Sequence, residues 1–539
     1  MILAIVFILT AITAMILIPF VGAKWKGLVT IITICLNSVL SGFIALKTLT
    51  GTNTLFTFPG SYVTGLIPVR IDALSGWFML IIDFTFITGA IYGFHYMKAY
   101  RAQRTNLSIH WIAYISAHAS LITITAIQNS LAFLIVWEIM ALSSFLLIIF
   151  EHYNKGTLKA GINFLIQSHV SILLLTLPFI GVAVKMNTFD FTAITAFSLR
   201  NPLLTDLGLF LCLFAGFAIK AGFVPFHTWL PYAHPAAPAH VSGIMSGVII
   251  KIGIYGILRM LLLIKSDYMT TGYLILFFSI ISGIYGVMLA ILQHNLKRLL
   301  AYHSIENIGI IGIGIGLGCI GLGSGSQLLC MLGFAGALLH TLNHSLFKSL
   351  LFYSAGNVYQ ATHTVNIEHL GGLSKRMPHT SLLFLIAALA ICGLPPFNGF
   401  ISEFLIYNGM LAGMHDAPLV QLWAIIFSIF GLALIGGLAL LCFTKAFGTV
   451  FLGTTRSGLN EPVKEARTGT LIPMYAGLIL IILIGIFPSF FVKALSLPAG
   501  LFVSKIGKIE QAETLFSMDT LNMITLCALC LFGLSGLLF

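Results

Sequence analysis

The chain has 539 residues, of which 58% are hydrophobic and 8% are charged. Because a soluble globular protein carries about 25% charged residues, this composition excludes a water-soluble fold of this length. The formal net charge is +11 at pH 7. The basic residues lie in short loops between apolar segments, a distribution that favours orientation in a membrane and argues against nucleic-acid binding.

Apolar segments recur along the whole chain. A membrane-spanning helix needs about 20 mostly apolar residues, and about 15 segments meet that requirement. We therefore expect an all-α, polytopic transmembrane bundle. In chain order the segments are 2–21, 28–46, 72–96, 108–127, 130–150, 161–184, 207–230, 241–264, 272–292, 299–318, 328–356, 380–411, 420–450, 471–491 and 521–539.

The loops between these segments predict the orientation. Cytoplasmic loops are enriched in lysine and arginine. With the N-terminus outside, the basic loops Lys98–Arg104 and Lys375–Arg376 lie in the cytoplasm. The first apolar segment lacks a preceding basic stretch and a small-residue cleavage site, so we interpret it as a membrane helix and not as a signal peptide.

Two of the apolar segments contain prolines that interrupt a helix. Pro225 lies in AIKAGFVPFHTWLP, and Pro395 and Pro396 are adjacent in AICGLPPFNGFISEF. Proline removes a backbone donor and clashes with the preceding turn, and in lipid the freed carbonyl groups need protein or water as partners. Breaks at matching places in two halves of a chain indicate an inverted-repeat transporter.

We therefore expect two inverted five-helix repeats, each with one broken helix. The repeats cover residues 107–267 and 268–455. N-terminal transmembrane helices at 1–106 precede them, and a loop with further helices at 456–539 follows.

Four ionisable residues lie inside apolar segments: Glu138 in LIVWEIM, Lys220 in FAGFAIKAG, Lys251 in SGVIIKIGIYG and Glu403 in GFISEFLIY. A charge at the centre of a membrane helix costs about 2.5–3.5 kcal/mol even on a mild insertion scale. Each residue must therefore face a polar interior or a partner. A buried lysine loads and releases a proton readily, so this set predicts a proton path, with a purely structural ion pair as the alternative.

His340, His344 and Lys348 in LLHTLNHSLFKSLLF are spaced by four residues, which places them on one helix face. Such a stripe can pass protons along a file of water. HxxxH is also a metal-ligand spacing, but no glutamate follows the first histidine as in HExxH, so we favour the proton path over a metal site. A satisfied polar cluster between helices is the second alternative. His227, just after Pro225, is a further candidate for the path.

The glycine-rich run GIIGIGIGLG, Gly309–Gly318, has spacings like those of a dinucleotide-binding fingerprint. That fingerprint requires a preceding strand and a soluble βαβ unit. Because this run lies inside an apolar segment, it predicts close helix packing through small residues.

Several longer motifs resemble one protein family. AIKAGFVPFHTWLPYAHPAAPAHVSGIMSGVIIKIGIYGILR, HNLKRLLAYHSIENIG, LLHTLNHSLFKSLLFYSAG and LGGLSKRMPHTSLLFLIAALAICGLPPFNGFISEFLIY are similar to the antiporter-like subunits of respiratory complex I and of Mrp-type antiporters. Within that family, PAAPAHVSGIMSGVIIK and SIENIG look most like the large antiporter-like subunit of formate hydrogenlyase and related membrane-bound nickel–iron hydrogenases.

The resemblance implies a role for each matching residue. Glu138 matches the acidic residue of the family's fifth helix, Lys220 its partner on the broken seventh and Lys251 the lysine of the eighth. The second half of the path is implied by four residues: Lys297 at the start of the tenth helix, His340 and His344 on the eleventh, and Glu403 on the broken twelfth.

The resemblance also implies a function. The chain would translocate protons as a subunit of a redox-driven complex in the cell's inner (cytoplasmic) membrane, beside other membrane and peripheral subunits. It would carry no catalytic residue, no metal and no redox cofactor of its own. Two alternatives stay open: a subunit of a cation/proton antiporter without redox chemistry, in which sodium replaces protons in part, and a structural anchor whose proton path is vestigial.

Overall fold

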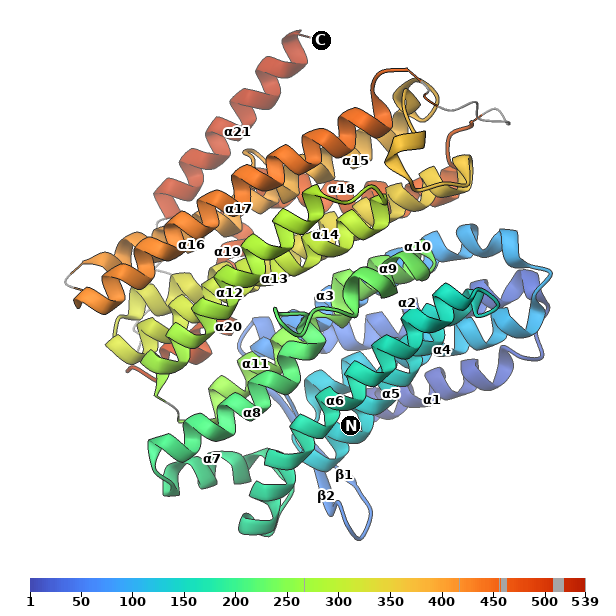
Figure 1. Ribbon diagram of the computed structural model, residues 1–539. Helices are drawn as coiled ribbons and strands as arrows, with labels where there is room; N and C mark the ends of the chain where they lie inside the picture. Colours follow the sequence, from blue (N-terminus) through green and yellow to red (C-terminus); the bar gives the residue numbers. More distant parts are fainter. Residues whose placement is uncertain (266, 416, 455, 457–462, 508–517, 539) are drawn as a thin grey trace. The chain divides into compact units, whose positions relative to one another are not determined.

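The computed structural model describes residues 1–265, 267–415, 417–454, 456, 463–507 and 518–538. These residues are almost entirely helical (Figure 1). They divide into two compact units, one made of Met1–Gly222 with Phe226–Asp267 and the other of Phe223–Pro225 with Tyr268–Phe539.

The first unit contains a short hairpin among its helices. β1 and β2 pair antiparallel, with Thr54 opposite Ile71. The elements of this unit are α1 (Ile2–Leu17), α2 (Ala23–Leu49), β1 (Thr54–Pro59), β2 (Leu66–Ile71), α3 (Ala73–Tyr96), η1 (Met97–Tyr100), α4 (Arg104–Ala126), α5 (Ser130–Ile148), η2 (Ile149–Glu151), α6 (Lys155–Met186), α7 (Phe191–Arg200), α8 (Leu203–Ala221), α9 (Leu230–Ala236), α10 (Ala239–Ile244), η3 (Met245–Ile249) and α11 (Lys251–Leu263).

The second unit is built of helices only, within its described residues. Its long helices α12, α13, α14 and α17 run side by side (Figure 1). The elements are α12 (Tyr268–Ile291), α13 (Leu296–Ser324), α14 (Gln327–Thr362), η4 (Ile367–His369), η5 (Leu373–Lys375), α15 (Pro378–Ile391), α16 (Asn398–Met414), α17 (Leu419–Phe451), α18 (Thr468–Ile486), α19 (Pro488–Ala494), α20 (Ser496–Val503) and α21 (Met518–Leu538).

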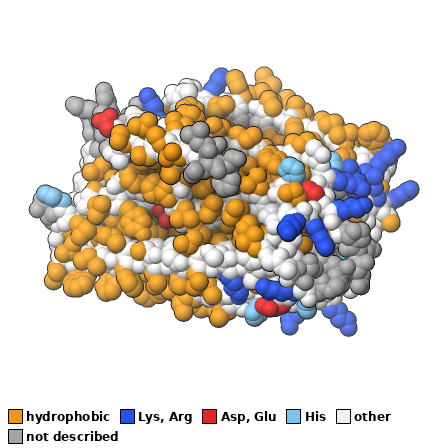
Figure 2. All heavy atoms as spheres, turned by 90° about the horizontal axis from the view of Figure 1, so that it is seen from above, with side chains coloured by type: hydrophobic (Ala, Val, Ile, Leu, Met, Phe, Trp, Pro, Cys, Tyr) orange, Lys and Arg blue, Asp and Glu red, His pale blue; other side chains and the backbone are white. Residues whose placement is uncertain are grey.

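Ten of the described helices are long and apolar enough to cross a membrane. Hydrophobic side chains cover most of the face shown in Figure 2, while lysine and arginine side chains gather near its margins. The predicted all-α, polytopic fold is thus confirmed. Each of the 15 predicted segments contains a helix, but fewer qualify as full spans, partly because the proline-interrupted segments fold as shorter pieces such as α15, which has 14 residues.

A small hydrogen-bonded motif occurs once in each unit. In the first, the amide of Phe191 donates to Gln128 and the amide of Ser130 donates to Phe189. In the second, the amide of Ile367 donates to His294 and the amide of Leu296 donates to Val365.

In both copies of this motif an asparagine caps the helix that follows. Asn129 accepts a hydrogen bond from the amide of Ala132 at the start of α5, and Asn295 accepts one from the amide of Arg298 at the start of α13. Such a side chain satisfies an amide that the first helical turn leaves unpaired. The duplicated motif makes α5 and α13 structural counterparts, although the predicted limits of the repeats stay a prediction.

Both predicted helix breaks are present. The first lies between Ala221 and Leu230 and contains Pro225, and the second separates Ile391 from Asn398 and contains Pro395 and Pro396. Each upstream helix is followed by a glycine in the left-handed region, Gly222 (φ +88°) and Gly393 (φ +64°). Glycine adopts this backbone conformation without steric strain, so it ends the helix before the prolines are reached.

The glycine run of α13 packs closely against two neighbouring helices. A Cβ atom at Gly309 would lie 2.6 Å from backbone atoms of α12, and one at Gly314 would lie 2.9 Å from the carbonyl oxygen of Gly333 on α14. The expectation of close packing through small residues is confirmed, because a side chain at either position would force the helices apart. This contact places the polar residues of α13 directly beside α14.

Candidate functional site

Lys220 lies in the last turn of α8, and only 1% of its surface is exposed. Its ammonium group is 4.5 Å from the centre of the Phe164 ring and has no hydrogen-bond partner among the described residues. The partial negative charge of a helix C-terminus and the face of an aromatic ring both attract a cation. These attractions are non-directional, so they hold the ammonium group without giving its protons a fixed acceptor.

Glu138 on α5 forms an ion pair with His169 on α6, with 3.3 Å between Oε1 and Nε2. Its other oxygen, Oε2, is buried and has no hydrogen bond within the described structure. The resemblance implied that Lys220 is the partner of Glu138. Glu138 and Lys220 attract each other, and His169 on α6, which packs directly on α5, is a second partner of Glu138 that the sequence analysis did not name.

Lys251 is the first residue of α11 and follows η3, a turn of π-helix. It is 1% exposed, and its Nζ atom donates to the backbone carbonyl of Ser246 over 2.5 Å. A π-helical turn is wider than an α-helical one and is frequent at functional sites. Here the wider turn presents a carbonyl group to the ammonium group five residues later, so the polar contact needs no second helix.

The histidines after the first break are buried. His227 is 6% exposed. His240 on α10 lies against His110 on α4, with 2.8 Å between their Nε2 atoms. One ring must donate and the other accept across this contact, so the pair can carry at most one proton more than its neutral form without charge repulsion.

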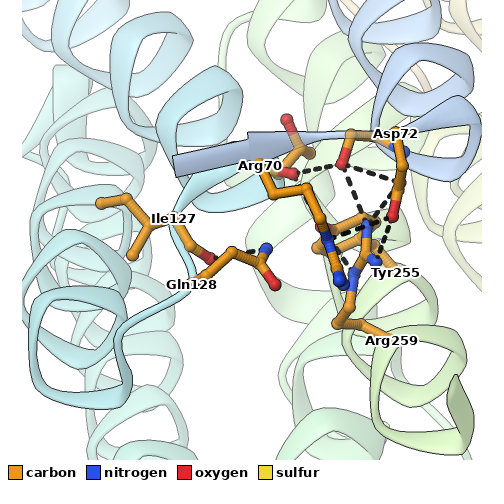
Figure 3. A network of polar contacts seen from close by, with 8 residues as sticks. Arg70, Asp72, Ile127, Gln128, Tyr255 and Arg259 are labelled. Atoms are coloured by element: carbon orange, nitrogen blue, oxygen red, sulfur yellow. Dashed lines mark hydrogen bonds and ion pairs between the residues drawn. The ribbon is translucent and has the colours of Figure 1, made fainter. Parts of the chain in front are cut away.

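An ion-pair network joins the hairpin to α3 and α11 (Figure 3). Arg259 donates to Asp72 through Nη1 (2.6 Å) and Nη2 (2.8 Å), and Arg70 on β2 lies 3.6 Å from the same carboxylate. Burial opposes ionisation of Asp72, but the guanidinium of Arg259 outweighs it and holds the pKa of this carboxyl group well below its ordinary value. The network fixes α11, and therefore Lys251, against the start of α3.

The same network reaches α4. The hydroxyl groups of Tyr255 and Ser75 both donate to the carbonyl of Thr125, over 2.7 Å and 2.6 Å. Tyr255 lies one turn after Lys251 and one turn before Arg259, so the three residues share a face of α11.

A second buried pair links α3 with α4. Asp83 accepts a hydrogen bond from the hydroxyl of Ser41 (2.7 Å), and its other oxygen lies 3.0 Å from Nε2 of His118. Asp83 is 5% exposed and His118 is fully buried. A carboxylate in a membrane interior needs such hydrogen-bond and ion-pair partners.

In the second unit, α14 presents the predicted polar stripe to α13. His340, His344 and Lys348 are all fully buried. Nε2 of His340 lies 3.1 Å from Oδ1 of Asn307 on α13, and Nζ of Lys348 donates to the carbonyl of Leu300 on the same helix. Residues four apart on α14 therefore face one neighbour, as their spacing predicted.

The stripe continues to the broken helix. Nδ1 of His340 lies 2.9 Å from the hydroxyl of Ser402 on α16, and Asn343 donates to the same hydroxyl and to the carbonyl of Asn398. The side chain of Glu403 folds back over the break, since a Cβ atom at Gly393 would lie 2.6 Å from its Oε2 atom. The carboxylate of Glu403 therefore lies beside the backbone groups that the proline break leaves without helical partners. Within a membrane such groups need protein or water as partners.

On α13, Lys297 is 5% exposed and its ammonium group lies 5.7 Å from the centre of the Tyr359 ring. Two turns later the structure shows a pair that the sequence interpretation missed. Nδ1 of His303 contacts Oε2 of Glu306, and both residues are fully buried.

The missed residues carried the same signal as the predicted ones. Asp83 in IIDFTF, Arg259 in ILRMLLL and Glu306 in SIENIG are charges inside apolar segments. The rule that singled out Glu138 and Lys220 would have found them, had it been applied to every predicted span.

The arrangement suits proton transfer. Histidine side chains exchange protons near neutral pH, and buried carboxyl groups and lysines do so when desolvated. Within the described residues, no group of three or more histidine, cysteine, aspartate or glutamate side chains is placed to hold a metal ion. The chemistry that the buried side chains themselves support is the movement of charge.

Comparison with known proteins agrees with this arrangement. Hydrogenase-4 component B of Escherichia coli (strain K12) is 36% identical over 411 residues, which cover 75% of this chain and 60% of that protein. Formate hydrogenlyase subunit 3 of the same organism is 32% identical over 407 residues, covering 75% of this chain and 64% of that protein. The chain thus spans less than two thirds of the length of these curated relatives.

A solved structure shares the fold. The Mrp complex from Dietzia sp. DQ12-45-1b contains a chain that superposes with a TM-score of 0.78 and 17% sequence identity, covering 94% of this chain and 98% of that one.

Residues 128–431, more than half of the sequence, match the family described as NADH:quinone oxidoreductase/Mrp antiporter, transmembrane. This region contains Glu138, Lys220, Lys251, Glu306 and Glu403. The resemblance drawn from the motifs is therefore confirmed, and the chain belongs to the NADH:quinone oxidoreductase/Mrp antiporter transmembrane family.

Proposed function

We propose that this chain translocates protons through a membrane as one subunit of a redox-driven complex. The observation that carries the proposal is a set of buried polar side chains between α13, α14 and α16: Asn307 contacts His340, and His340 contacts Ser402. Lys348 on α14 donates to the carbonyl of Leu300 on α13. Polar groups of this kind are expensive inside a membrane protein and mark ion pathways. Lys220 and Lys251 place two further buried ammonium groups in the first unit.

The names of two relatives support the redox coupling. They are components of a hydrogenase and of formate hydrogenlyase. Under this proposal, electron transfer takes place in partner subunits, this chain holds no redox cofactor, and the complex lies in the cytoplasmic membrane. The proton path uses the predicted residues in both units. Its members are Glu138, Lys220, His227, Lys251, Lys297, His340, His344, Lys348 and Glu403.

The test is proton uptake by vesicles that contain the whole complex, measured together with electron transfer. We expect Lys348→Met to lower the number of protons moved per electron about tenfold or more, because a positioned proton-transfer group typically speeds its proton-transfer step by roughly 10²–10⁴-fold. Lys185→Ala is the matched control, because Lys185 is exposed. A wild-type complex that transfers electrons without moving protons would refute the proposal.

The second candidate function is that of an antiporter subunit without redox chemistry. The fold that this chain shares with the Mrp chain supports this candidate. The same vesicles separate the two. An antiporter exchanges protons for sodium down an imposed sodium gradient with no electron donor present. The proposed subunit moves protons only when electrons flow.

A further inference from the structure

Glu306 and His303 form an isolated acid–base pair in the interior of the second unit. They lie one turn apart on α13, His303 Nδ1 contacts Glu306 Oε2, and neither residue is exposed. The imidazole ring also packs against Phe443 on α17, with 4.4 Å between ring centres. The pair is therefore held from two sides by packing.

Two polar atoms of this pair have no partner in the described structure. Oε1 of Glu306 and Nε2 of His303 are buried without a hydrogen bond. A buried polar atom without a partner costs about 1–3 kcal/mol, and such atoms are rare unless a proton, a water or a function accounts for them. Each side chain thus uses one atom to hold the other and keeps one atom available for proton exchange.

A lysine faces this pair from the next helix. Lys348 on α14 donates to the carbonyl of Leu300, one turn before His303, which places its ammonium group against α13. Glu306 and Lys348 attract each other, and Glu306 and Glu403 repel each other. The ionisable groups that interact with Glu306 are His303 on α13, Lys348 on α14, Cys392 at the break, Glu403 on α16 and Cys442 on α17, and Lys445 on α17 interacts with Cys442. His340 and His344 lie on α14, the helix of Lys348.

The charges of the cluster do not balance by themselves. Glu306 and Glu403 are two carboxyl groups, and Lys348 is the fully buried lysine beside them. Lys445 is only partly buried, and its Nζ atom is bound to the carbonyl of Ile291. An unpaired charge is strongly disfavoured in a low-dielectric interior. One additional proton makes the cluster neutral, so the cluster as a whole holds one exchangeable proton.

Hydrogen bonds lead from the pair to the broken helix. Asn307, next to Glu306, donates to the carbonyl of His303 over 2.8 Å and contacts His340, which in turn contacts Ser402 beside Glu403. This connection joins the sequence neighbours of the two glutamates, Asn307 and Ser402, through His340. For a proton that leaves Glu306, Lys348 on α14 is a candidate acceptor.

We propose that Glu306, oriented by His303, is the proton-loading residue of the second unit, and that it exchanges its proton with Lys348. In this step the O–H bond of the Glu306 carboxyl group breaks and an N–H bond forms on Lys348 Nζ, which leaves a carboxylate and an ammonium group. The first state returns when Lys348 passes its proton on and the Glu306 carboxylate takes up a new one. This inference rests on the proposed function and adds a residue to its path.

Each unit has a glutamate on its copy of this helix, although not at the same position. Glu138 lies nine residues after Asn129 on α5, and Glu306 lies eleven residues after Asn295 on the counterpart helix α13. Each unit thus contains an acid on the corresponding helix and a buried lysine that it attracts, Lys220 in the first and Lys348 in the second. A purely structural carboxylate would need a full set of partners, which Glu306 does not have.

The experiment uses the whole complex in vesicles. Glu306→Gln keeps the size and polarity of the side chain and removes the exchangeable proton. We expect it to assemble, to transfer electrons and to move about tenfold fewer protons per electron. Glu306→Asp should restore part of the proton movement. Ser354→Ala is the matched control, because Ser354 is buried on α14 and, among the described residues, its hydroxyl bonds only to the carbonyl of Leu350 on its own helix.

Infrared difference spectra of the working complex give a second readout. A protonated carboxyl group that loses its proton during turnover changes its C=O stretching band. This band should vanish in Glu306→Gln and shift in Glu306→Asp. If Glu306→Gln fails to assemble, an Asp variant whose spectrum matches wild type would still overturn the inference.

The outcomes separate this inference from the proposed function. A wild-type complex that moves no protons contradicts the proposed function itself. If wild type moves protons and Lys348→Met does not, while Glu306→Gln keeps the wild-type ratio of protons to electrons, only the role of Glu306 is wrong.

Discussion

At the scale of single residues, the buried charges of this chain differ in how tightly they are held. Asp72 and Arg259 share two hydrogen bonds, whereas Lys220 has a ring contact and no hydrogen bond in the described structure. A fully paired charge is a structural element, because moving its proton would break the pair. A loosely held charge can gain and lose a proton at little structural cost. The contrast separates residues that position helices from residues that carry protons.

The loosely held residues give the first prediction. Glu138→Gln removes the charge that attracts Lys220, and Lys220→Ala removes the proton carrier. Both should lower proton movement per electron while the complex still assembles. The double variant should be little worse than the worse single variant, because residues acting as one unit are not additive. Proton uptake alongside electron transfer measures this, and normal ratios in both single variants would show that the two residues are structural.

Asp72 gives a prediction about stability. Asp72→Asn leaves the buried guanidinium of Arg259 without its counter-charge, and breaking a buried pair in this way costs about 3–5 kcal/mol. Thermal unfolding of the purified chain in detergent should show a lower Tm. Ser61→Ala is the control, because Ser61 lies in the exposed hairpin turn and its hydroxyl bonds to neighbouring Thr64.

The same residue predicts a pH dependence. Because the folded-state pKa of Asp72 lies below its ordinary value, its contribution to stability is complete above the unfolded value of about 3.9. It is lost as the pH falls below that value and through the folded-state pKa. The gap in Tm between wild type and Asp72→Asn should therefore be constant from neutral pH to about pH 5 and should narrow in stronger acid. A gap that is unchanged in strong acid would contradict the assignment.

At the scale of elements, the two broken helices share one construction. Each upstream helix is followed by a glycine with positive φ, prolines prevent its continuation, and a new helix begins after a short gap. In the second unit this construction brings Glu403 beside Gly393. The break therefore interrupts the helical hydrogen bonds and also positions the carboxylate of Glu403.

Gly393→Ala tests this construction. The left-handed backbone at this position costs an alanine about 1–2 kcal/mol, and its Cβ atom would collide with the carboxylate of Glu403. We expect a lower Tm and reduced proton movement. Gly436→Ala on α17 is the control, because nothing lies within 4 Å of its added Cβ atom, and a helical alanine is favoured over glycine by about 0.5–1 kcal/mol. Equal behaviour of the two variants would argue against a special role for the break.

At the scale of the whole molecule, the membrane fixes the orientation of the chain through its loops. The hairpin between α2 and α3 and the loop after α4 lie on the same side, since Val69 pairs with Ile127. Successive spans alternate in direction, so the loop before α4 lies on the other side. The excess of lysine and arginine there predicts that this side is the cytoplasm.

Single-cysteine labelling checks the orientation. Cys212, Cys527 and Cys530 are exposed and would first be replaced. A cysteine introduced by Arg101→Cys should resist an impermeant thiol reagent in intact cells and react after permeabilisation. Tyr62→Cys in the exposed hairpin should react in intact cells. Ready labelling at position 101 from outside would reverse the predicted topology.

The sequence by itself determined the class of protein, the broken helices and some of the buried charges. These follow from local properties: the length of apolar runs, the missing amide of Pro225 and Pro396, and the presence of a charge such as Lys348 within a run. Each can be read within about 20 residues of chain, because a membrane-spanning helix satisfies its own backbone hydrogen bonds.

Only the tertiary structure decided which charges meet. Asp72 pairs with Arg259, 187 residues away, and His110 meets His240, 130 residues away. Glu138 contacts His169, a partner that the sequence analysis did not name. Partner choice depends on which faces of two helices pack together, and that is set by close-packed surfaces such as the glycines of α13 against α12 and α14. Spacing along the chain places a charge on a helix face, but only packing decides what that face touches.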